Sequence, residues 1–326
     1  MEAGGARLSA IGLGTWQFYA PEWGYGRKYA DTVARPLVAR ALDLGINLID
    51  TAEIYGLGRS ERIVGEALGQ RREEAFIATK VTPVLPLAPV VEQRARASLK
   101  RLRTDRIDLY QLHWPNPVVS DGPAMAGMRR LIDEGVVKHA GVSNYKLARW
   151  QSAERALGGP VLTNQVRFNL VERRPLLDLV PFAQSEGRIV IAYSPLAQGL
   201  LGGRYDADNR PSGAIRRANP LFLPENLERA APLIDVLREV ARSHQCTPAQ
   251  VALAWVIRRP NVVAIPGASS VEQLEANAAA AELDLTDSED DQLSAAADRF
   301  EPVRGAAVAR GLAESALETV RMRLGR

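Results

Sequence analysis

The first residues that could do chemistry lie in the stretch Asn47–Gly56. It opens with a short apolar run, Ile46–Ile49, typical of a buried parallel strand, and Asp50 and then Tyr55 follow. An ionisable residue at the end of an apolar strand lies on the rim of the sheet, where α/β folds place their chemistry. A tyrosine near a carboxylate is more often part of an ordinary surface loop, so this stretch alone does not identify a site.

Two further apolar strands also end in ionisable residues. Ala75–Thr79 is followed by Lys80, and Ile107–Leu112 is followed by His113. If these strands are neighbours of the first, the lysine and the histidine converge with the aspartate and the tyrosine on one face of the sheet.

Such a group could protonate an oxygen while a carbonyl becomes an alkoxide. A free tyrosine hydroxyl has a pKa near 10, which a nearby ammonium from Lys80 would lower, and Asp50 would hold that lysine in place. His113 is suited to gripping a carbonyl oxygen. Because these residues include no obvious nucleophile and no electron source, a cofactor must bring the reducing equivalent.

Each residue also has a purely structural interpretation. Lys80 and Asp50 could form an ion pair at the strand rim, and His113 could be a packed loop residue. Lys80 could also serve as the Schiff-base nucleophile of a barrel isomerase or lyase, which Tyr55 and Asp50 beside it disfavour. The joint occurrence of all four residues favours the reductive chemistry.

Strand and helix patterns alternate along the chain. Eight strands are expected, at Leu8–Leu13, Ile46–Ile49, Ala75–Thr79, Ile107–Leu112, Val136–Val142, Val161–Thr163, Ile189–Ala192 and Val262–Ile265. The helices expected with them are 32–44, 60–68, 86–102, 125–134, 146–157, 176–186, 232–244, 248–258, 271–280 and 288–298, with Asp31, Ser60, Thr247 and Thr286 as start signals and a long loop at 196–226. This pattern predicts an α/β fold, a single-domain (β/α)₈ TIM barrel over residues 1–300 with extra helices, and a C-terminal helical extension at 301–326.

Composition excludes several other classes of protein. The 326 residues are 46% hydrophobic and 24% charged, with a net charge of +3 and no dense basic blocks, so no nucleic-acid partner is expected. Cys246 is the only cysteine and the three histidines are far apart, so neither a disulfide nor a metal site is expected. Without a membrane-length apolar span or a signal peptide at Met1–Ala10, we expect no membrane partner and a cytoplasmic location.

At this point the sequence resembles the aldo-keto reductases. The resemblance rests on Gly14-Thr15-Trp16, Asp50-Thr-Ala-Glu-Ile-Tyr55-Gly56, Thr79-Lys80, Leu112-His113-Trp114-Pro115, Gly141-Val-Ser143-Asn144, Tyr193-Ser194-Pro195-Leu196 and Ile265-Pro266-Gly267. These motifs occur in the family's order over roughly residues 8 to 300. The resemblance implies that Tyr55 is the general acid, that Lys80 and Asp50 tune it, and that His113 orients the substrate.

The family binds a nicotinamide dinucleotide across the barrel mouth without a G-x-G-x-x-G fingerprint, and no such fingerprint follows a strand here. The resemblance implies that Ser143, Asn144 and Gln165 hold the carboxamide and that Tyr193 stacks on the nicotinamide ring. The remaining cofactor contacts that it implies are Gly14, Thr15, Trp16 and Asp50, then Ser194, Pro195, Leu196, Gln198, Gly199, Leu200 and Arg204 near the pyrophosphate, and Gly267, Ser269, Gln273 and Asn277 near the adenosine.

Two departures bear on cofactor choice. Many family members carry Lys or Arg, which grips the 2′-phosphate of NADP, where this chain has Ser269, and Glu275 is displaced by one position from the usual motif. Ser269 can still donate to a phosphate, and Arg216 or Arg217 could supply charge. NADP(H) is therefore the preferred cofactor, with NAD(H) possible.

The sequence thus predicts an NADP(H)-dependent oxidoreductase that converts aldehydes and ketones to alcohols, with a small-molecule carbonyl or alcohol as its partner. Substrate choice is expected to depend on Trp16, Tyr19, Trp23, Tyr25, Trp114 and the loop Gly199–Pro224. The alternative is a cofactor-binding regulatory subunit resembling potassium-channel β subunits, whose adenosine-site serine resembles Ser269. The sequence makes no prediction of oligomeric state.

Overall fold

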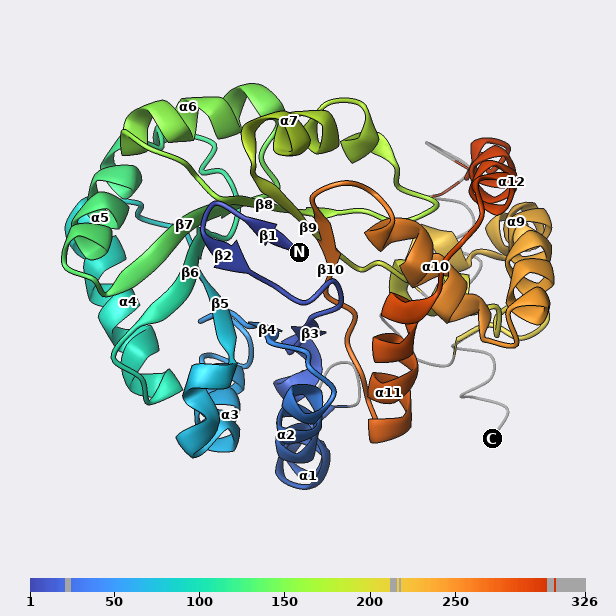
Figure 1. Ribbon diagram of the computed structural model, residues 1–326, viewed down its shortest axis with the longest axis horizontal. Helices are drawn as coiled ribbons and strands as arrows, with labels where there is room; N and C mark the ends of the chain where they lie inside the picture. The colour runs from blue at the N-terminus through green and yellow to red at the C-terminus, as the bar shows by residue number, and fades with distance from the viewer. Residues whose placement is uncertain (21–24, 212–215, 217, 304–307, 309–326) are drawn as a thin grey trace.

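A barrel of eight parallel strands organises the chain, in a computed structural model that describes residues 1–20, 25–211, 216, 218–303 and 308 (Figure 1). The strands, in their order around the sheet, are β3 (Leu13–Gly14), β4 (Leu48–Asp50), β5 (Phe76–Val81), β6 (Ile107–Leu112), β7 (Val137–Ser143), β8 (Thr163–Arg167), β9 (Ile189–Tyr193) and β10 (Val262–Ala264). The two edges meet where Ile11 bridges Ala264, and the Gly12 amide donates to the Ala264 carbonyl over 2.8 Å. The (β/α)₈ barrel expected from the sequence is confirmed.

Helices surround the strands. They are α1 (Arg27–Tyr29), the π-helix η3 (Ala30–Ala34), α2 (Arg35–Asp43), α3 (Arg59–Leu68), α4 (Ala88–Leu102), α5 (Gly122–Asp133), α6 (Leu147–Leu157), α7 (Leu179–Glu186), α9 (Pro224–Ser243), α10 (Pro248–Ile257), α11 (Val271–Ala279) and α12 (Asp287–Asp298). Short 3₁₀ helices are η1 (Trp16–Tyr19), η4 (Gly69–Glu74), η5 (Arg174–Leu176), η6 (Ala197–Gly202), η7 (Pro220–Phe222) and η8 (Ala280–Glu282). The extra helices α9 and α12 pack beside each other at one side of the barrel (Figure 1).

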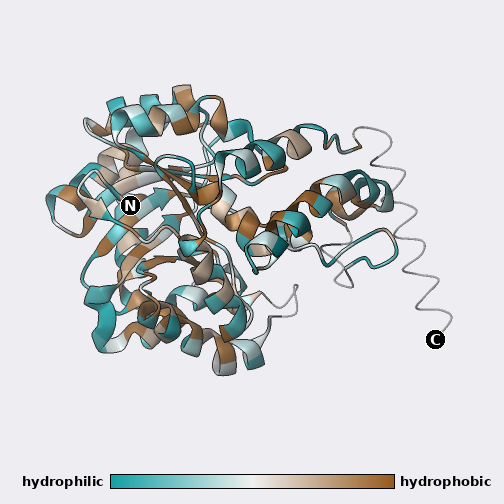
Figure 2. Cartoon of the chain, turned by 45° about the vertical axis from the view of Figure 1, so that its right-hand side comes forward, coloured by the Kyte–Doolittle hydropathy of each residue, from teal (hydrophilic) through white to brown (hydrophobic). Residues whose placement is uncertain are grey.

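Apolar side chains form two cores. The larger core lies between the strands and the surrounding helices. Figure 2 shows hydrophobic residues, in brown, along the strands and interspersed with hydrophilic ones in the helices. The smaller core fills the barrel itself, with Leu48, Phe76, Leu109 and Ile191 among its buried members.

The sequence pattern did not predict the hairpin at the N-terminus. Its strands, β1 (Glu2–Ala3) and β2 (Ala6–Arg7), pair antiparallel and lie across the barrel centre in Figure 1. Ala6 belongs to the core inside the barrel. The hairpin therefore covers the end of the barrel where the strands begin.

Helix starts were predicted with mixed success. Thr247 and Thr286 each form a capping box at the start of α10 and α12, as predicted. Asp31 does not begin a helix, because helical backbone already starts at Arg27. Ser60 is not a cap either, since Gly58, with φ of 81°, precedes α3 and Ser60 is buried within it. The helix predicted from Pro232 begins at Pro224, with the proline inside it.

Several strands end later along the chain than the sequence predicted, so that site residues lie within them. The strand predicted at Val161–Thr163 starts at Thr163 and continues through Gln165 to Arg167, while Lys80 and Ser143 also lie within strands. The expected first strand, Leu8–Leu13, is reduced to the bridge at Ile11 and to β3. The predicted loop 196–226 contains η6 and η7. Most of the predicted C-terminal extension lies outside the described residues.

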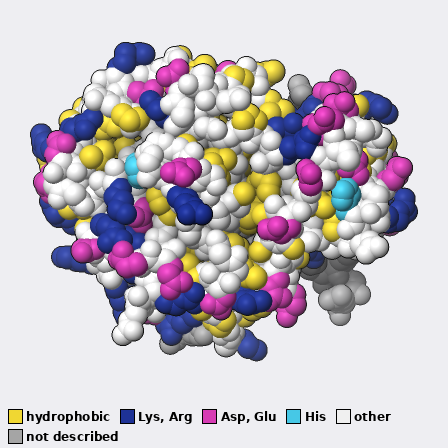
Figure 3. All heavy atoms as spheres, in the orientation of Figure 1, with side chains coloured by type: hydrophobic (Ala, Val, Ile, Leu, Met, Phe, Trp, Pro, Cys, Tyr) yellow, Lys and Arg dark blue, Asp and Glu magenta, His cyan; other side chains and the backbone are white. Residues whose placement is uncertain are grey.

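The surface gives no sign of a basic tract on the face shown in Figure 3. Acidic and basic side chains are interspersed there, with apolar side chains between them. None of the helices in the described part of the chain is long and apolar enough to cross a membrane.

Candidate active site

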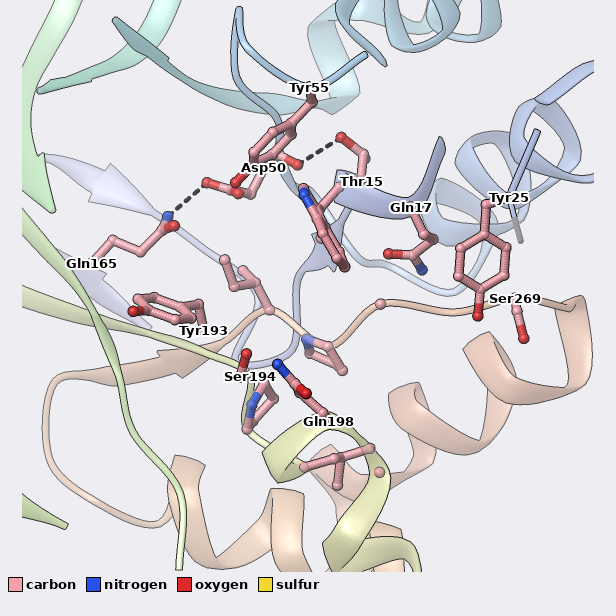
Figure 4. Close-up of a pocket in the computed structure, with 18 of the residues that line it drawn as sticks. Thr15, Gln17, Tyr25, Asp50, Tyr55, Gln165, Tyr193, Ser194, Gln198 and Ser269 are labelled. Atoms are coloured by element: carbon pink, nitrogen blue, oxygen red, sulfur yellow. Dashed lines mark hydrogen bonds between the residues drawn. The ribbon is translucent and has the colours of Figure 1, made fainter. Parts of the chain in front are cut away.

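A cavity of about 730 Å³ opens where the barrel strands end. It is lined by the predicted site residues Gly14, Thr15, Trp16, Asp50, Tyr55, His113, Ser143, Asn144, Gln165, Tyr193, Ser194, Pro195, Leu196, Gln198, Gly199, Arg204, Gly267, Ser269 and Gln273. Three predicted residues are outside this lining: Lys80 is fully buried, Leu200 lies in the core, and Asn277 is nearly buried. Figure 4 shows Asp50 and Tyr55 at one end of the cavity and Ser269 at the other.

Lys80 lies at the centre of a buried polar group. Its Nζ donates to Asp50 Oδ1 over 2.6 Å, to the Thr51 carbonyl over 2.9 Å and to Tyr55 Oη over 3.3 Å. These three partners satisfy all three N–H groups of the ammonium. Strand register explains the encounter, because Asp50 ends β4 and Lys80 is near the end of the adjacent strand β5.

The pKa values in this group follow from burial and from the ion pair. Burial favours neutral lysine, yet Asp50 and Tyr55 outweigh it, so the pKa of Lys80 is raised and the ammonium persists. Burial also raises the pKa of Tyr55, and the opposing effect of Lys80 only partly offsets it. Lys80 thus lowers the pKa of Tyr55 as expected, but desolvation, which the expectation left out, raises it by more.

His113 faces Tyr55 across the cavity wall. The two rings meet edge to face with centroids 5.7 Å apart, and Trp114 packs 4.7 Å from the imidazole. Burial, together with the charge of Lys80, lowers the pKa of His113 to about 3. The imidazole is thus neutral at physiological pH and carries one N–H that can be donated.

Amide and hydroxyl groups extend this network to β7, β8 and β9. Gln165 Nε2 donates to Asp50 Oδ2 over 2.7 Å, shown as a dashed line in Figure 4, and Ser143 Oγ donates to the Gln165 carbonyl over 2.8 Å. Tyr193 Oη donates to Asn144 Oδ1 over 3.0 Å. The backbone of Asn144 has φ of 62°, a left-handed conformation that an asparagine tolerates.

Two residues that support the site, Ser60 and Glu53, were not anticipated from the sequence in this role. Ser60, buried in α3, donates to the Thr15 carbonyl over 3.0 Å and contacts Thr15 Oγ1 at 2.7 Å. Thr51 Oγ1 also donates to Ser60 Oγ over 3.0 Å. This hydroxyl cluster joins α3 to the ends of β3 and β4, immediately beneath Asp50.

Glu53, two residues before Tyr55, is the other supporting residue that was missed. Its side chain is 7% exposed, accepts a hydrogen bond from the Thr82 amide, and pairs with Arg94 Nε at 2.8 Å. Its own amide donates to the Lys80 carbonyl over 3.3 Å. Its position within the Asp50–Gly56 motif was the available signal, but nothing in the sequence identifies Arg94 as its partner.

The other end of the cavity is built from loops. Ser194, Ala197 and Gln198 all have left-handed backbone, with φ of 50°, 48° and 59°. The Ser269 hydroxyl and amide both donate to Gln273 Oε1 over 2.9 Å. Sparsely populated conformations of this kind, in non-glycine residues, concentrate at functional loops.

Glycine is required where the walls approach closely. A Cβ on Gly14 would lie 2.8 Å from the Ile265 carbonyl oxygen, and one on Gly267 would lie 2.4 Å from the amide of Gln17. Gln17 in turn donates to the Ala268 carbonyl over 2.8 Å. The β3 loop and the β10 loop therefore form one continuous wall.

The predicted substrate wall is largely present in the lining. Trp16, Tyr19, Tyr25 and Trp114 line the cavity, whereas Trp23 lies outside the described residues. Arg216 also lines it, and Arg217 lies outside the described residues. Tyr205, from the predicted loop Gly199–Pro224, lines the cavity too, whereas sequence reasoning did not name Gln17, Ile54, Ile265 and Pro266 as site residues.

Comparison with known proteins decides the family. The family model described as "Aldo/keto reductase family" matches residues 10–298. The chain belongs to this family. It is similar to an uncharacterized oxidoreductase of Mycobacterium tuberculosis (strain ATCC 25618 / H37Rv), with 59% identity over 297 residues, 91% of this chain and 92% of the relative. It is also similar to the methylglyoxal reductase YeaE of Escherichia coli (strain K12), with 36% identity over 88% of this chain and 90% of that protein.

Solved aldo/keto reductase structures agree. A glycerol dehydrogenase from Gluconobacter oxydans superposes with a TM-score of 0.84 at 29% identity, covering 94% of this chain and 97% of the other. An aldo/keto reductase from Klebsiella pneumoniae, solved in complex with NADP and acetate, has a TM-score of 0.71 at 31% identity, with 93% and 95% coverage. The family and these relatives identify the chain as an aldo/keto reductase, an oxidoreductase.

Proposed function

We propose that this aldo/keto reductase uses NADP(H) to reduce aldehydes and ketones to alcohols, with Tyr55 as the general acid. The observation that carries the proposal is the hydrogen-bonded series from Asp50 through Lys80 to Tyr55, with separations of 2.6 and 3.3 Å, at the wall of the cavity. It provides a neutral phenol with a permanent cation beside its oxygen.

The residues of the cavity suit a nicotinamide dinucleotide. Side-chain amides of Asn144 and Gln165 at one end fit a carboxamide, and Tyr193 offers an aromatic surface. At the other end, α11 begins at Val271 beside Ser269 and Gln273, and a helix N-terminus favours phosphate. When bound, such a cofactor would supply a hydride.

The protein's own residues would manage the proton. Tyr55 Oη would donate its proton to the carbonyl oxygen as that oxygen gains negative charge, and the Lys80 ammonium would stabilise the phenolate that remains. Asp50 keeps the lysine charged and in position. The neutral imidazole of His113 would donate a hydrogen bond to the same carbonyl oxygen, which orients the substrate.

Tyr55→Phe tests this proposal directly. We expect turnover with an aldehyde panel to fall by about 10²- to 10⁴-fold, the usual contribution of a general acid, while NADPH affinity from fluorescence titration changes little. Tyr110→Phe is the matched control, because Tyr110 is buried in β6 outside the cavity lining and its hydroxyl has no hydrogen-bond partner among the described residues, and it should keep most of its turnover. Unchanged turnover in Tyr55→Phe would contradict the assignment.

Cofactor choice needs its own measurement. Relatives differ in this respect, since an Escherichia coli (strain K12) protein of 31% identity is named an NADH-specific methylglyoxal reductase, whereas a Klebsiella pneumoniae neighbour was crystallised with NADPH. Parallel titrations with NADPH and NADH should show tighter binding of NADPH. Tight binding of either one without turnover of any carbonyl compound would instead support the regulatory-subunit alternative.

A further inference from the structure

Exposed apolar side chains gather on one side of the cavity mouth. Among the described residues, eight large apolar side chains are exposed, and only Leu177 lies elsewhere, after β8. The other seven, here named the apolar rim, follow β3, β4, β5 and β6: Trp16, Ile54, Leu57, Val84, Leu85, Leu87 and Val118. Scattered exposed apolar residues are ordinary, but seven of the eight fall in four consecutive loops at the end of the barrel where the cavity opens, a concentration that calls for an explanation.

Contacts between the loops make the rim continuous. Gly56 packs on Tyr19, since a Cβ on the glycine would lie 2.7 Å from the tyrosine Cβ. Glu53 accepts from the Thr82 amide, and Asn116 Nδ2 donates to the Pro83 carbonyl over 2.8 Å. The β3, β4, β5 and β6 loops are thus joined in successive pairs.

The rim is also continuous with the cavity. Trp16 and Ile54 both line the cavity and are 40% and 43% exposed, so they belong to both surfaces. Two of the rim loops carry no charge: the β5 loop 82–87 and the β6 loop 113–119 contain no Asp, Glu, Lys or Arg, and Glu53 in the β4 loop is buried against Arg94. The cation that follows the β4 loop, Arg59, is stacked over the ring of Tyr19, 4.5 Å from its centroid. A charged or strongly hydrated substrate group would gain nothing there.

We propose that the apolar rim binds the hydrocarbon tail of the substrate, so that this reductase prefers aldehydes with long apolar chains over small polar ones. This inference rests on the proposed function. The carbonyl group would lie at Tyr55 and His113, and the tail would leave the cavity past Ile54 and Trp16 along the rim. Each CH₂ group that moves from water onto this surface adds binding free energy, which a two-carbon or three-carbon substrate cannot gain.

Chain length is therefore the variable to test. For the NADPH-loaded protein with propanal, pentanal, heptanal and nonanal, we expect kcat/KM to rise roughly two- to fourfold per added CH₂ group. Val84→Ser combined with Leu85→Ser should flatten this rise, with nonanal losing about tenfold more than propanal. Both side chains are more than half exposed, at 72% and 53%, so folding is not at risk. Leu177→Ser, at an exposed leucine of the β8 loop, is the matched control and should keep the full rise.

A binding experiment separates this inference from the proposed chemistry. Calorimetric titration with n-alkyl carboxamides, which present a carbonyl oxygen but are not reduced, should show the same dependence on chain length in wild type and the same flattening in the double variant. If all turnover is absent but this dependence persists, the proposed reduction fails and the rim assignment stands.

Three results would overturn the rim assignment. In the first, neither kcat/KM nor carboxamide affinity of wild type rises with chain length. In the second, the double variant retains the full rise in both. In the third, wild type is a dimer that becomes monomeric in the double variant, while the dependence on chain length stays unchanged. The last result would assign the rim to a second copy of the chain.

Discussion

The two ends of the cavity are built in opposite ways. At the Tyr55 end, the polar groups come from strands and are almost inaccessible, with Lys80 at 0%, Asp50 at 2% and Gln165 at 3% exposure. At the Ser269 end, the groups come from loops and the start of α11, and Gln273 and Arg204 are exposed. The first end is held by hydrogen bonds among its own side chains, whereas in the second Ser269 and Gln273 bond to each other within one short segment.

This difference between the two ends predicts which substitutions should have the larger effects. A charge buried in a closed network costs a great deal when its partner is removed, because no water replaces it. An exposed group loses little, since solvent takes over its hydrogen bonds. Substitutions at the Tyr55 end should therefore change folding and chemistry together, and substitutions at the Ser269 end should change cofactor affinity alone.

Lys80→Met is the strongest test of the contrast. Removing the ammonium leaves the Asp50 carboxylate buried, with Gln165 as its one side-chain donor among the described residues, which should lower the free energy of unfolding by about 3–5 kcal/mol. Turnover should fall by about 10²-fold or more, because Tyr55 loses its cation. Urea denaturation and aldehyde turnover measure the two effects.

The double variant Lys80→Met with Asp50→Asn is the control for the buried charge. Neutralising the carboxylate should restore part of the lost stability without restoring turnover, since the phenol still lacks its cation. If the single variant unfolds like wild type, water reaches Asp50 and the two ends of the cavity do not differ as described.

Glu53→Gln tests whether the buried end extends beyond the tetrad. Glutamine keeps the shape and an acceptor for the Thr82 amide but removes the ion pair with Arg94, so the turn that carries Tyr55 should lose some of its fixed position. We expect kcat to fall by about tenfold with KM for NADPH unchanged.

The matched control is Glu92→Gln, which removes a surface pair with Arg130, whose side chain is 58% exposed. It should leave kcat unchanged. An equal decrease in both variants would indicate a general loss of stability and not a change in the position of Tyr55.

The sequence predicted the Tyr55 end better than the Ser269 end, and the contrast explains why. A residue at the end of an apolar strand is placed by the barrel itself, so Asp50, Lys80 and His113 could be brought together from strand boundaries alone. Ser60 shows the limit of this reasoning: it was predicted to be a cap because the pattern marks where a helix starts and not which face becomes buried. The left-handed backbone at Ser194, Ala197 and Gln198 has no signature in those residue types.

Most of the eight strands were predictable because they contain an apolar run. In contrast, β8 (Thr163–Arg167) is largely polar and only its first residue fell within the predicted strand, and the first predicted strand is reduced to the bridge at Ile11 and β3. The N-terminal hairpin was not predictable, since its strands have two residues each and pair only with each other. The apolar rim was not predictable either, because a leucine or valine in a loop can be exposed or buried, and the sequence alone does not show which.

Ser269→Arg probes the exposed end. An arginine there would add a charge-assisted hydrogen bond to a 2′-phosphate, so NADPH should bind about tenfold more tightly while NADH affinity stays within about twofold. With NADPH at saturating concentration, kcat should not change. Ser269→Ala is the control, since it removes only the hydroxyl that donates to Gln273. A large fall in kcat in Ser269→Arg would show that this end is coupled to the chemistry.

The pH dependence of stability tests the buried end in a different way. The pKa of His113 is about 3 in the folded chain, because of burial and the Lys80 charge, against about 6.5 for an unfolded histidine. Between these values the unfolded chain binds the proton more readily, so the free energy of unfolding falls as pH falls below about 6.5, and above that pH the residue contributes nothing.

His113→Asn removes this titration, and the loss of stability between pH 7 and pH 5 should be smaller in the variant by about 2 kcal/mol. Urea midpoints at the two pH values measure it. His139→Asn is the comparison, because burial also lowers the pKa of His139, near the start of β7 and away from the cavity, and its effect should be additive with that of His113. An unchanged pH dependence in His113→Asn would mean that the imidazole is as well solvated as the groups around Ser269, and the contrast between the two ends would then rest on Asp50 and Lys80 alone.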